Sequence, residues 1–111
     1  MRAGRLRQRV TLMHPVEGAK DKYGQPAKAF EPVATVWASV EPIRGREFFA
    51  AQQVNSETTT RIRIRYRREY AGAQVNEWRI EYDGRTYEID GPPIDTDARH
   101  TQLEFMCHER L

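Results

Sequence analysis

The sequence predicts an all-β fold, a small barrel of about six strands with one short helix and long polar loops. The strongest signal is a strict alternation over residues 59–66, where arginines at every second position alternate with Ile62, Ile64 and Tyr66. A second signal is Asp83-Gly84 between two alternating runs, because both positions of a type I′ hairpin turn need positive φ. Closing such strands into a barrel removes edges that would otherwise aggregate.

Two prolines set the predicted ends of the first two strands. A strand over residues 8–13 ends at Pro15, and a strand over residues 33–41 ends at Pro42. Trp37 lies on the polar face of the second of these strands, which indicates that this face is partly covered. The predicted strands are residues 8–13, 33–41, 59–66, 78–82, 85–89 and 102–109.

Three stretches between these strands are predicted to lie outside the sheet. Residues 14–32 form a long polar loop rich in glycine and proline, and loops of this length in a compact domain are often functional. Residues 44–53, which include Phe48 and Phe49, favour a short helix, although an extended loop has a similar pattern. Residues 95–100 predict a second exposed loop.

The size and composition of the chain predict one folded domain over residues 1–111 with a thin core. Its residues are 39% hydrophobic and 31% charged, which excludes a disordered chain and predicts much polar surface. Cys107 is the single cysteine, so no intrachain disulfide forms. No apolar run approaches the ~18 residues of a membrane span. The basic N-terminus lacks the apolar segment of a secretory signal, so a cytosolic location is expected.

Charge is divided unevenly along the chain. Residues 1–68 carry 14 Lys or Arg and 6 Asp or Glu, whereas residues 69–111 carry 4 and 10. Of the 18 basic residues 15 are arginine, which favours bidentate pairing with carboxylate or phosphate. Either opposite charges pair within one fold, or a subunit with one positive and one negative face associates head to tail into a ring. The sequence alone favours the first interpretation.

No catalytic or metal-binding pattern stands out. His14, His100, His108 and Cys107 lack the spacing of a zinc site, and the adjacent side chains of Cys107 and His108 point to opposite faces of a strand. We therefore expect Cys107 to be a small buried apolar residue. There is no nucleophile elbow and no glycine-rich phosphate loop, so the sequence predicts neither an enzyme nor a cofactor.

A basic ladder is defined by Arg61, Arg63, Arg65 and Arg67, and it has two interpretations. Arginines on one strand face can track nucleic-acid phosphates, but aromatic residues for base stacking are not interleaved with them on that face. Like charges at alternate positions repel unless carboxylates lie opposite, and the second half of the chain offers such carboxylates. Cross-strand or inter-subunit salt bridges are therefore favoured, and the candidate partners are Glu77, Glu81, Glu88 and Glu104.

The segment of residues 45–51 joins two strong strands and also has two interpretations. Either it forms a helix that caps the open end of the barrel with Phe48 and Phe49 buried, or it projects to contact a neighbour or line a channel. The sequence does not choose between them.

A series of short motifs, kept in order from end to end, resembles one known family. These motifs are Met1-x-Ala3-Gly4-x-Leu6-Arg7-x-Arg9-Val10, Asp21-x-Tyr23-Gly24-Gln25, Val36-Trp37-Ala38-x-Val40-x-Pro42, Gly45-Arg46-Glu47, Thr60-Arg61-Ile62-x-Ile64-Arg65-Tyr66-Arg67, Arg79-Ile80 before Asp83-Gly84, Tyr87-x-Ile89, and a last strand that ends in Glu109. Each motif alone is weak, but together the series resembles the head–tail joining proteins of tailed bacteriophages, also called head closure or stopper proteins.

The resemblance implies a β-barrel subunit that assembles as a ring in the virion, below the portal and its adaptor. Such a ring closes the DNA exit and provides the docking face for the tail. Its implied partners are portal and adaptor ring proteins, tail proteins and further copies of the chain, with non-specific contact with DNA in the channel and none with a membrane. Before assembly the protein would lie in the bacterial cytoplasm.

By position, the resemblance assigns partner contacts to the first long loop and to the segment after the Trp37-Ala38 strand. The candidate partner-binding residues are Lys20, Asp21, Lys22, Tyr23, Gly24, Arg44, Arg46, Glu47, Phe48 and Phe49. The basic ladder would face a neighbouring subunit or DNA. Reversing Arg61, Arg63 and Arg65 to glutamate is expected to abolish ring formation or joining and to leave a folded monomer. The alternative is a nucleic-acid-binding barrel of the oligonucleotide-binding type, which the basic ladder suggests.

Overall fold

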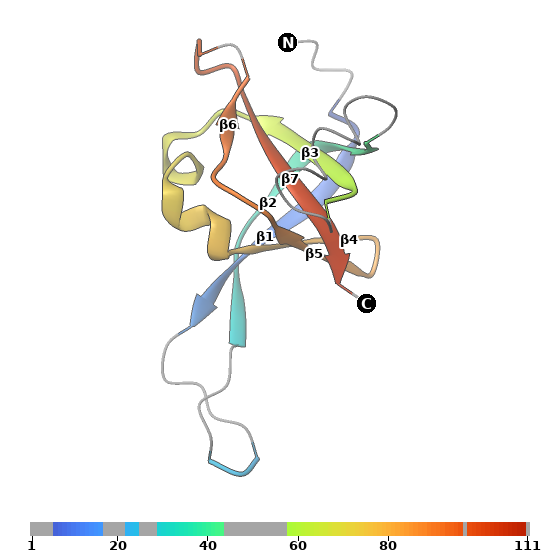
Figure 1. Ribbon diagram of the computed structural model, residues 1–111, viewed down its shortest axis with the longest axis vertical. Coiled ribbons are helices and arrows are strands. Elements are labelled where there is room, and N and C mark those ends of the chain that lie inside the picture. The colour runs from blue at the N-terminus through green and yellow to red at the C-terminus, as the bar shows by residue number, and fades with distance from the viewer. Residues whose placement is uncertain (1–5, 17–21, 25–28, 44–57, 97, 111) are drawn as a thin grey trace.

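The computed structural model describes residues 6–16, 22–24, 29–43, 58–96 and 98–110 (Figure 1). Nine elements lie in this part of the chain, seven strands and two short 3₁₀ turns. They are β1 (Gln8–Val16), β2 (Ala29–Pro42), β3 (Thr60–Arg65), η2 (Arg68–Tyr70), η3 (Ala73–Glu77), β4 (Arg79–Tyr82), β5 (Arg85–Ile89), β6 (Ile94–Asp95) and β7 (Gln102–Arg110).

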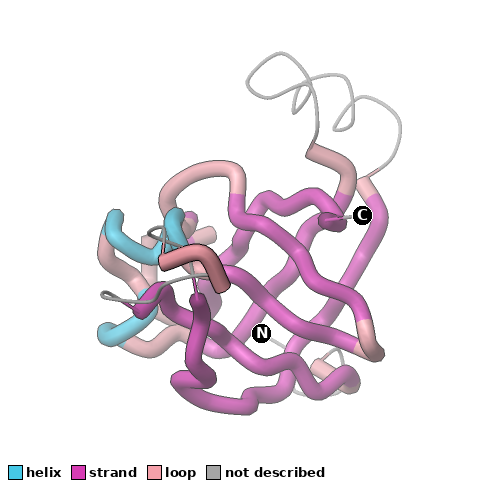
Figure 2. The backbone as a smooth tube through the Cα atoms, turned by 90° about the horizontal axis from the view of Figure 1, so that it is seen from below, coloured by secondary structure: helices cyan, strands magenta, loops and turns pink. Residues whose placement is uncertain are grey.

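Six of the strands close into an antiparallel barrel, which confirms the predicted fold class (Figure 2). Their order is β3-β2-β1-β4-β5-β7, and pairing between β3 and β7 completes the circle. The seventh strand, β6, pairs with β7 on the side opposite β3. It ends at Asp95, the first residue of the stretch 95–100 that was predicted to be an exposed loop.

The core lies inside the barrel and is formed by alternate residues of its strands. Ile62 and Ile64 of β3 are buried, whereas the arginines between them point outward, as the period-two pattern predicted. Cys107 is fully buried among the inward residues of β7, which confirms its predicted role as a small core residue. The largest fully buried side chains are Phe105, Leu12, Ile62, Ile64, Ile80, Leu103, Val10, Val75 and Cys107.

The hairpin of β1 and β2 is longer than predicted and forms a two-stranded arm below the barrel in Figure 1. Pro15 pairs with Phe30 inside the ladder, so neither the predicted stop at Pro15 nor the full loop of residues 14–32 is correct. Because β4 pairs with β1 only at residues 11–13, the arm has a single ladder, and strands with an unpaired edge tolerate proline. The register shifts between Leu12 and Met13, a β-bulge of the kind that bends a strand.

The turn between β4 and β5 is the predicted two-residue hairpin. Asp83 has a φ of 52° and Gly84 a φ of 75°, and Tyr82 pairs with Arg85 directly across the turn. Both turn residues therefore take the left-handed conformation that the type I′ turn requires.

The stretch around Gly72, between β3 and β4, forms η2 and η3, which bury Tyr70 and Val75. The predicted helix over residues 44–53 lies outside the described residues. None of the described helical turns is long and apolar enough to cross a membrane.

Candidate functional site

The basic ladder on the outer face of the barrel is divided into two halves. In the first half, Arg61 and Arg63 converge on Glu104 of β7, with their Nε atoms 2.6 and 3.2 Å from its Oε1 atom. The Arg63 Nε–H donates a hydrogen bond, whereas the Arg61 contact has the distance of an ion pair without hydrogen-bond geometry. Cross-strand pairing, the interpretation that the sequence favoured, therefore holds for these two arginines.

The second half of the ladder lacks such pairing. Arg65 lies opposite Gln102 of β7, an amide, and among the described residues no carboxylate lies within 4 Å of its guanidinium. Arg67 reaches only Glu69, at 3.8 Å between two exposed side chains. An ion pair of this kind contributes little. Two arginines of the ladder thus keep most of their capacity to bind an acidic group.

These two arginines line a groove of about 780 Å³ at the end of β3. Trp37 of β2 also lines it, with 52% of its surface exposed, so this side chain is only partly covered by the described residues. The guanidinium of Arg9 lies 4.8 Å from the centre of the Trp37 ring. The described residues that line it are Leu6, Arg7, Arg9, Thr35, Val36, Trp37, Arg65, Arg67 and Tyr70.

Cross-strand register explains why Trp37 lies among arginines. Arg9 pairs directly with Trp37, and the pairing of Ala38 with Ile64 places Trp37 and Arg65 on the same outer face. The expectation that no aromatic residue lies between arginines on that face is therefore wrong, because the ring comes from the neighbouring strand. Arg9 and Trp37 were not named as site residues. The sequence placed Trp37 on the polar face of its strand, but it gives no register between strands and so did not bring Arg9 beside it.

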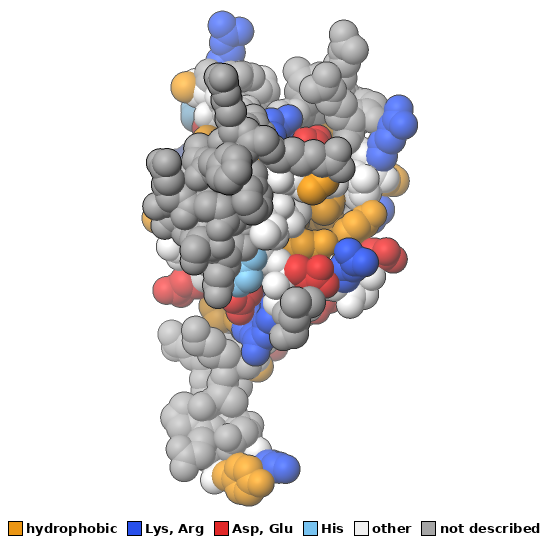
Figure 3. Space-filling model, turned by 45° about the vertical axis from the view of Figure 1, so that its right-hand side comes forward, with side chains coloured by type: hydrophobic (Ala, Val, Ile, Leu, Met, Phe, Trp, Pro, Cys, Tyr) orange, Lys and Arg blue, Asp and Glu red, His pale blue; other side chains and the backbone are white. Residues whose placement is uncertain are grey.

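The arm presents a second exposed feature in the turn of residues 22–24. Tyr23 is 76% exposed, Lys22 Nζ lies 5.1 Å from the centre of its ring, and Gly24 has a φ of 77°. The turn lies at the lower end of the molecule in Figure 3, away from the barrel. An exposed aromatic residue beside a cation at a projecting position suits contact with another protein.

The other predicted partner-binding residues lie outside the described part of the chain. The structure therefore does not place Lys20, Asp21, Arg44, Arg46, Glu47, Phe48 or Phe49.

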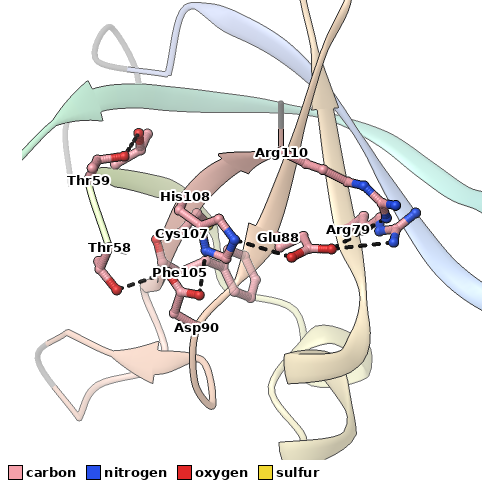
Figure 4. A network of polar contacts seen from close by, with 10 residues as sticks. Thr58, Thr59, Arg79, Glu88, Asp90, Phe105, Cys107, His108 and Arg110 are labelled. Carbon is pink, nitrogen blue, oxygen red and sulfur yellow. Dashed lines mark hydrogen bonds and ion pairs between the residues drawn. The ribbon is translucent and has the colours of Figure 1, made fainter. Parts of the chain in front are cut away.

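A polar network on β5 and β7 was missed by the sequence reasoning (Figure 4). The imidazole of His108 lies between two carboxylates, with Nδ1 2.6 Å from Asp90 Oδ1 and Nε2 3.2 Å from Glu88 Oε2. Thr58, just before β3, donates a hydrogen bond of 2.8 Å to Asp90 Oδ2. Asp90 is only 4% exposed, so these contacts compensate the burial of a charge and tie three segments together.

The carboxylate of Glu88 is shared with two arginines, Arg79 at 3.3 Å and Arg110 at 3.5 Å. Glu88 therefore contacts residues of β4 and β7 and not the basic ladder. No ion pair joins Glu77 or Glu81 to the ladder among the described residues. Of the four carboxylates predicted to face the ladder, only Glu104 does so.

The described residues offer no arrangement for metal or redox chemistry. They contain no group of three or more His, Cys, Asp or Glu side chains that would hold a metal ion. Burial, with a smaller contribution from the charge of Asp90, raises the pKa of the Cys107 thiol well above its usual value. The thiol is therefore held in its protonated, unreactive form.

Comparison with known proteins identifies the family to which this barrel belongs. A family model described as phage head completion protein matches residues 1–110. The head completion protein gp7 of Enterobacteria phage HK97 is 32% identical over 108 residues, which cover 96% of this chain and 95% of gp7. The chain belongs to the phage head completion protein family, a family of structural proteins, and its role is a structural one in head assembly.

Two solved structures share the fold. The solution structure of protein SF1141 from Shigella flexneri 2a superposes with a TM-score of 0.74 at 32% identity, covering 98% of this chain and 96% of that one. A chain from the virion of a native gene transfer agent particle superposes with a TM-score of 0.60 at 22% identity, covering 96% of each chain. The second likeness shows the fold alone. The resemblance to head–tail joining proteins is confirmed at the level of the family.

Proposed function

We propose that this chain is a connector subunit that assembles as a ring at the junction of phage head and tail. The ring closes the DNA exit channel below the portal and its adaptor, and it docks the tail. The observation that carries the proposal is the match to the head completion family over nearly the whole chain, residues 1–110. Because the match runs over nearly the whole chain, it supports a role for the barrel as a whole.

The proposal assigns different partners to different surfaces. The arm contacts the adaptor above the ring through Lys22, Tyr23 and Gly24 of its turn, together with Lys20 and Asp21, which precede them in the sequence. The segment from Arg44 to Phe49, with Arg46, Glu47 and Phe48, contacts a neighbour or the channel. The exposure of Tyr23 at the turn of the arm supports this division, because an exposed aromatic side chain offers a contact surface to another protein.

Electron microscopy of particles made without the gene would test the function directly. Separate heads that leak DNA, together with finished free tails, are expected, and adding the purified protein should rejoin them. Normal joined particles from the deletion strain would contradict the proposal.

Binding of single-stranded nucleic acid is the second candidate function. It is favoured by the outer row of Arg9, Trp37 and Arg65, which places an exposed ring between two cations. Stacking on such a ring and phosphate contacts to the arginines would give affinity without sequence preference. Salt-dependent binding of single-stranded DNA by the isolated chain would support this candidate, since releasing counterions makes such binding weaken as salt rises.

A further inference from the structure

The N-terminal half of β2 has a free edge next to the groove. β2 pairs with β1 along residues 29–38, but with β3 only along residues 38–42. Among the described residues, no strand pairs with residues 29–37 on the β3 side. The backbone amides and carbonyls on that side are therefore available to an incoming strand.

The groove lies in the plane of the sheet, beside this free edge. Thr35 and Trp37 belong to the outer face of β2, whereas Val36 lies on the inner face with its partner Val10 fully buried, and all three line the groove. Its other wall is formed by Arg65, Arg67 and Tyr70, where the chain leaves β3 and enters η2. Because residues from both faces of β2 line this groove, it lies where the next strand of the sheet would be.

The charge of the groove defines the occupant further. No carboxylate of the described chain lies within 4 Å of the guanidinium of Arg9 or Arg65, and Arg67 has one long, exposed contact. An occupant with carboxylates at alternate positions would meet these arginines on the outer face and pack an apolar side chain beside Val36 and Tyr70. Alternating acidic and apolar residues are the pattern of such a strand.

We propose that the groove binds an extended acidic segment of another protein of the particle, which adds to β2 as an extra antiparallel or parallel strand. The proposal rests on the connector function above and names the chemistry of one partner contact. Strand addition supplies affinity through backbone hydrogen bonds, while Arg9, Arg65 and Trp37 select for acidic residues that flank an apolar one.

A second copy of this chain is a poorer occupant. The exposed acidic residues Glu81 and Asp83 belong to β4 and its turn, and β4 is already paired with β1 and β5. The described strand edges that stay unpaired carry no acidic run to offer. Nucleic acid is also a poorer occupant, because it cannot complete a β ladder.

Hydrogen exchange followed by NMR on the full chain would test the proposal. The probe is a short synthetic peptide in which glutamate alternates with valine and tyrosine, and the control peptide keeps the glutamates but replaces the valines with proline. We expect the first peptide, and not the second, to slow amide exchange in residues 30–37 and to shift the Trp37 indole signal. Arg65→Glu should weaken binding about tenfold, whereas Arg99→Glu, at an exposed arginine outside the groove, should leave it unchanged.

Four results would overturn the proposal. One is an absence of added protection in residues 30–37 at millimolar peptide, with the spectrum showing a folded chain. Another is an oligothymidylate that shifts the groove signals without protecting β2, which would favour nucleic acid. The third is protection of β2 by self-association without peptide, which would favour a second copy. If Arg65→Glu abolishes peptide binding but still rejoins heads and tails, the groove contact is wrong and the connector function stands.

Discussion

The two charged regions of this barrel differ in how far their charges are paired. Around β7, Glu104, Glu88 and Asp90 bring together four arginines and one imidazole, namely those of Arg61, Arg63, Arg79, Arg110 and His108. At the free edge of β2, Arg9 and Arg65 surround an exposed tryptophan with no carboxylate in reach among the described residues. We call these the paired region and the open region.

The difference separates charges that support the fold from charges that are available for binding. A carboxylate at low exposure between several cations holds strands together, and removing it leaves buried charges without compensation. An exposed arginine without a partner contributes little to folding and keeps its hydrogen-bond donors for another molecule. Charged residues of similar type on one barrel are therefore expected to differ in how strongly their mutation lowers stability. Four predictions test this difference, in order from the largest expected effect on stability to the smallest.

Asp90→Ala should have the largest effect, because it removes the centre of the paired region. His108 and Thr58 would lose a nearly buried partner, and a destabilisation of about 3 kcal/mol is expected. Urea unfolding followed by tryptophan fluorescence would measure it. Glu69→Ala is the matched control, since that carboxylate makes only an exposed contact with Arg67. Equal stabilities of the two variants would contradict the division into regions.

Glu104→Gln should have the next largest effect. Arg61 and Arg63 would both lose their carboxylate while their side chains remain only 13% and 25% exposed, so about 1–2 kcal/mol should be lost. The same contacts make reversal of Arg61, Arg63 and Arg65 a poor test of assembly, because two of those changes would place glutamate beside Glu104. A double-mutant cycle with Arg63→Gln would measure the coupling. A coupling of zero would show that the pairing does not stabilise the barrel.

The parts of this fold that the sequence predicted are those in which local pattern and tertiary structure agree. The alternation of Ile62 and Ile64 with arginines fixed which face of β3 is buried, and Asp83-Gly84 fixed a turn that needs positive φ twice. Pro15 was misread as a stop because the rule against proline in strands assumes a ladder on both sides. Where only one edge is paired, the rule does not hold.

The candidate site was harder to predict from the sequence, because its residues come together through the register between strands and not through the periodicity within one strand. Trp37 and Arg9 are 28 positions apart in the sequence and meet only because β1 pairs with β2. The register of that pairing is shifted by a β-bulge, and no residue type in the sequence indicates the bulge. Asp90 was not singled out in the sequence, and His108 was considered only as a possible metal ligand. Their contact depends on how β5 and β7 meet.

The pH dependence of stability should carry a smaller contribution from Cys107, which lies beneath the paired region. Burial raises the pKa of this thiol in the folded state, so the unfolded chain loses the proton first as pH rises. The contribution is constant below the unfolded value of about 8.5 and is lost above it, by about 1 kcal/mol near pH 9.5. Comparing urea unfolding of wild type and Cys107→Ala from about pH 7.5 to 9.5 isolates the thiol. Parallel pH profiles of the two proteins would contradict it.

Changes in the open region should have the smallest effect on folding and the clearest effect on joining. Arg65→Glu reverses one charge of the groove, and Gln102→Glu leaves every arginine in place but gives Arg65 the carboxylate that Arg63 already has. Both variants should keep their free energy of unfolding within about 0.5 kcal/mol of wild type, because exposed charges contribute little. Both should nevertheless rejoin fewer heads and tails when added to particles made without the gene, whereas Arg99→Glu should rejoin them normally.

Because Gln102→Glu gives Arg65 a carboxylate partner within the chain, it tests whether the partner protein needs an unpaired arginine at this position. Full joining with Gln102→Glu but not with Arg65→Glu would show that the partner tolerates a competing carboxylate, and that the sign of the charge at position 65 matters more than its availability.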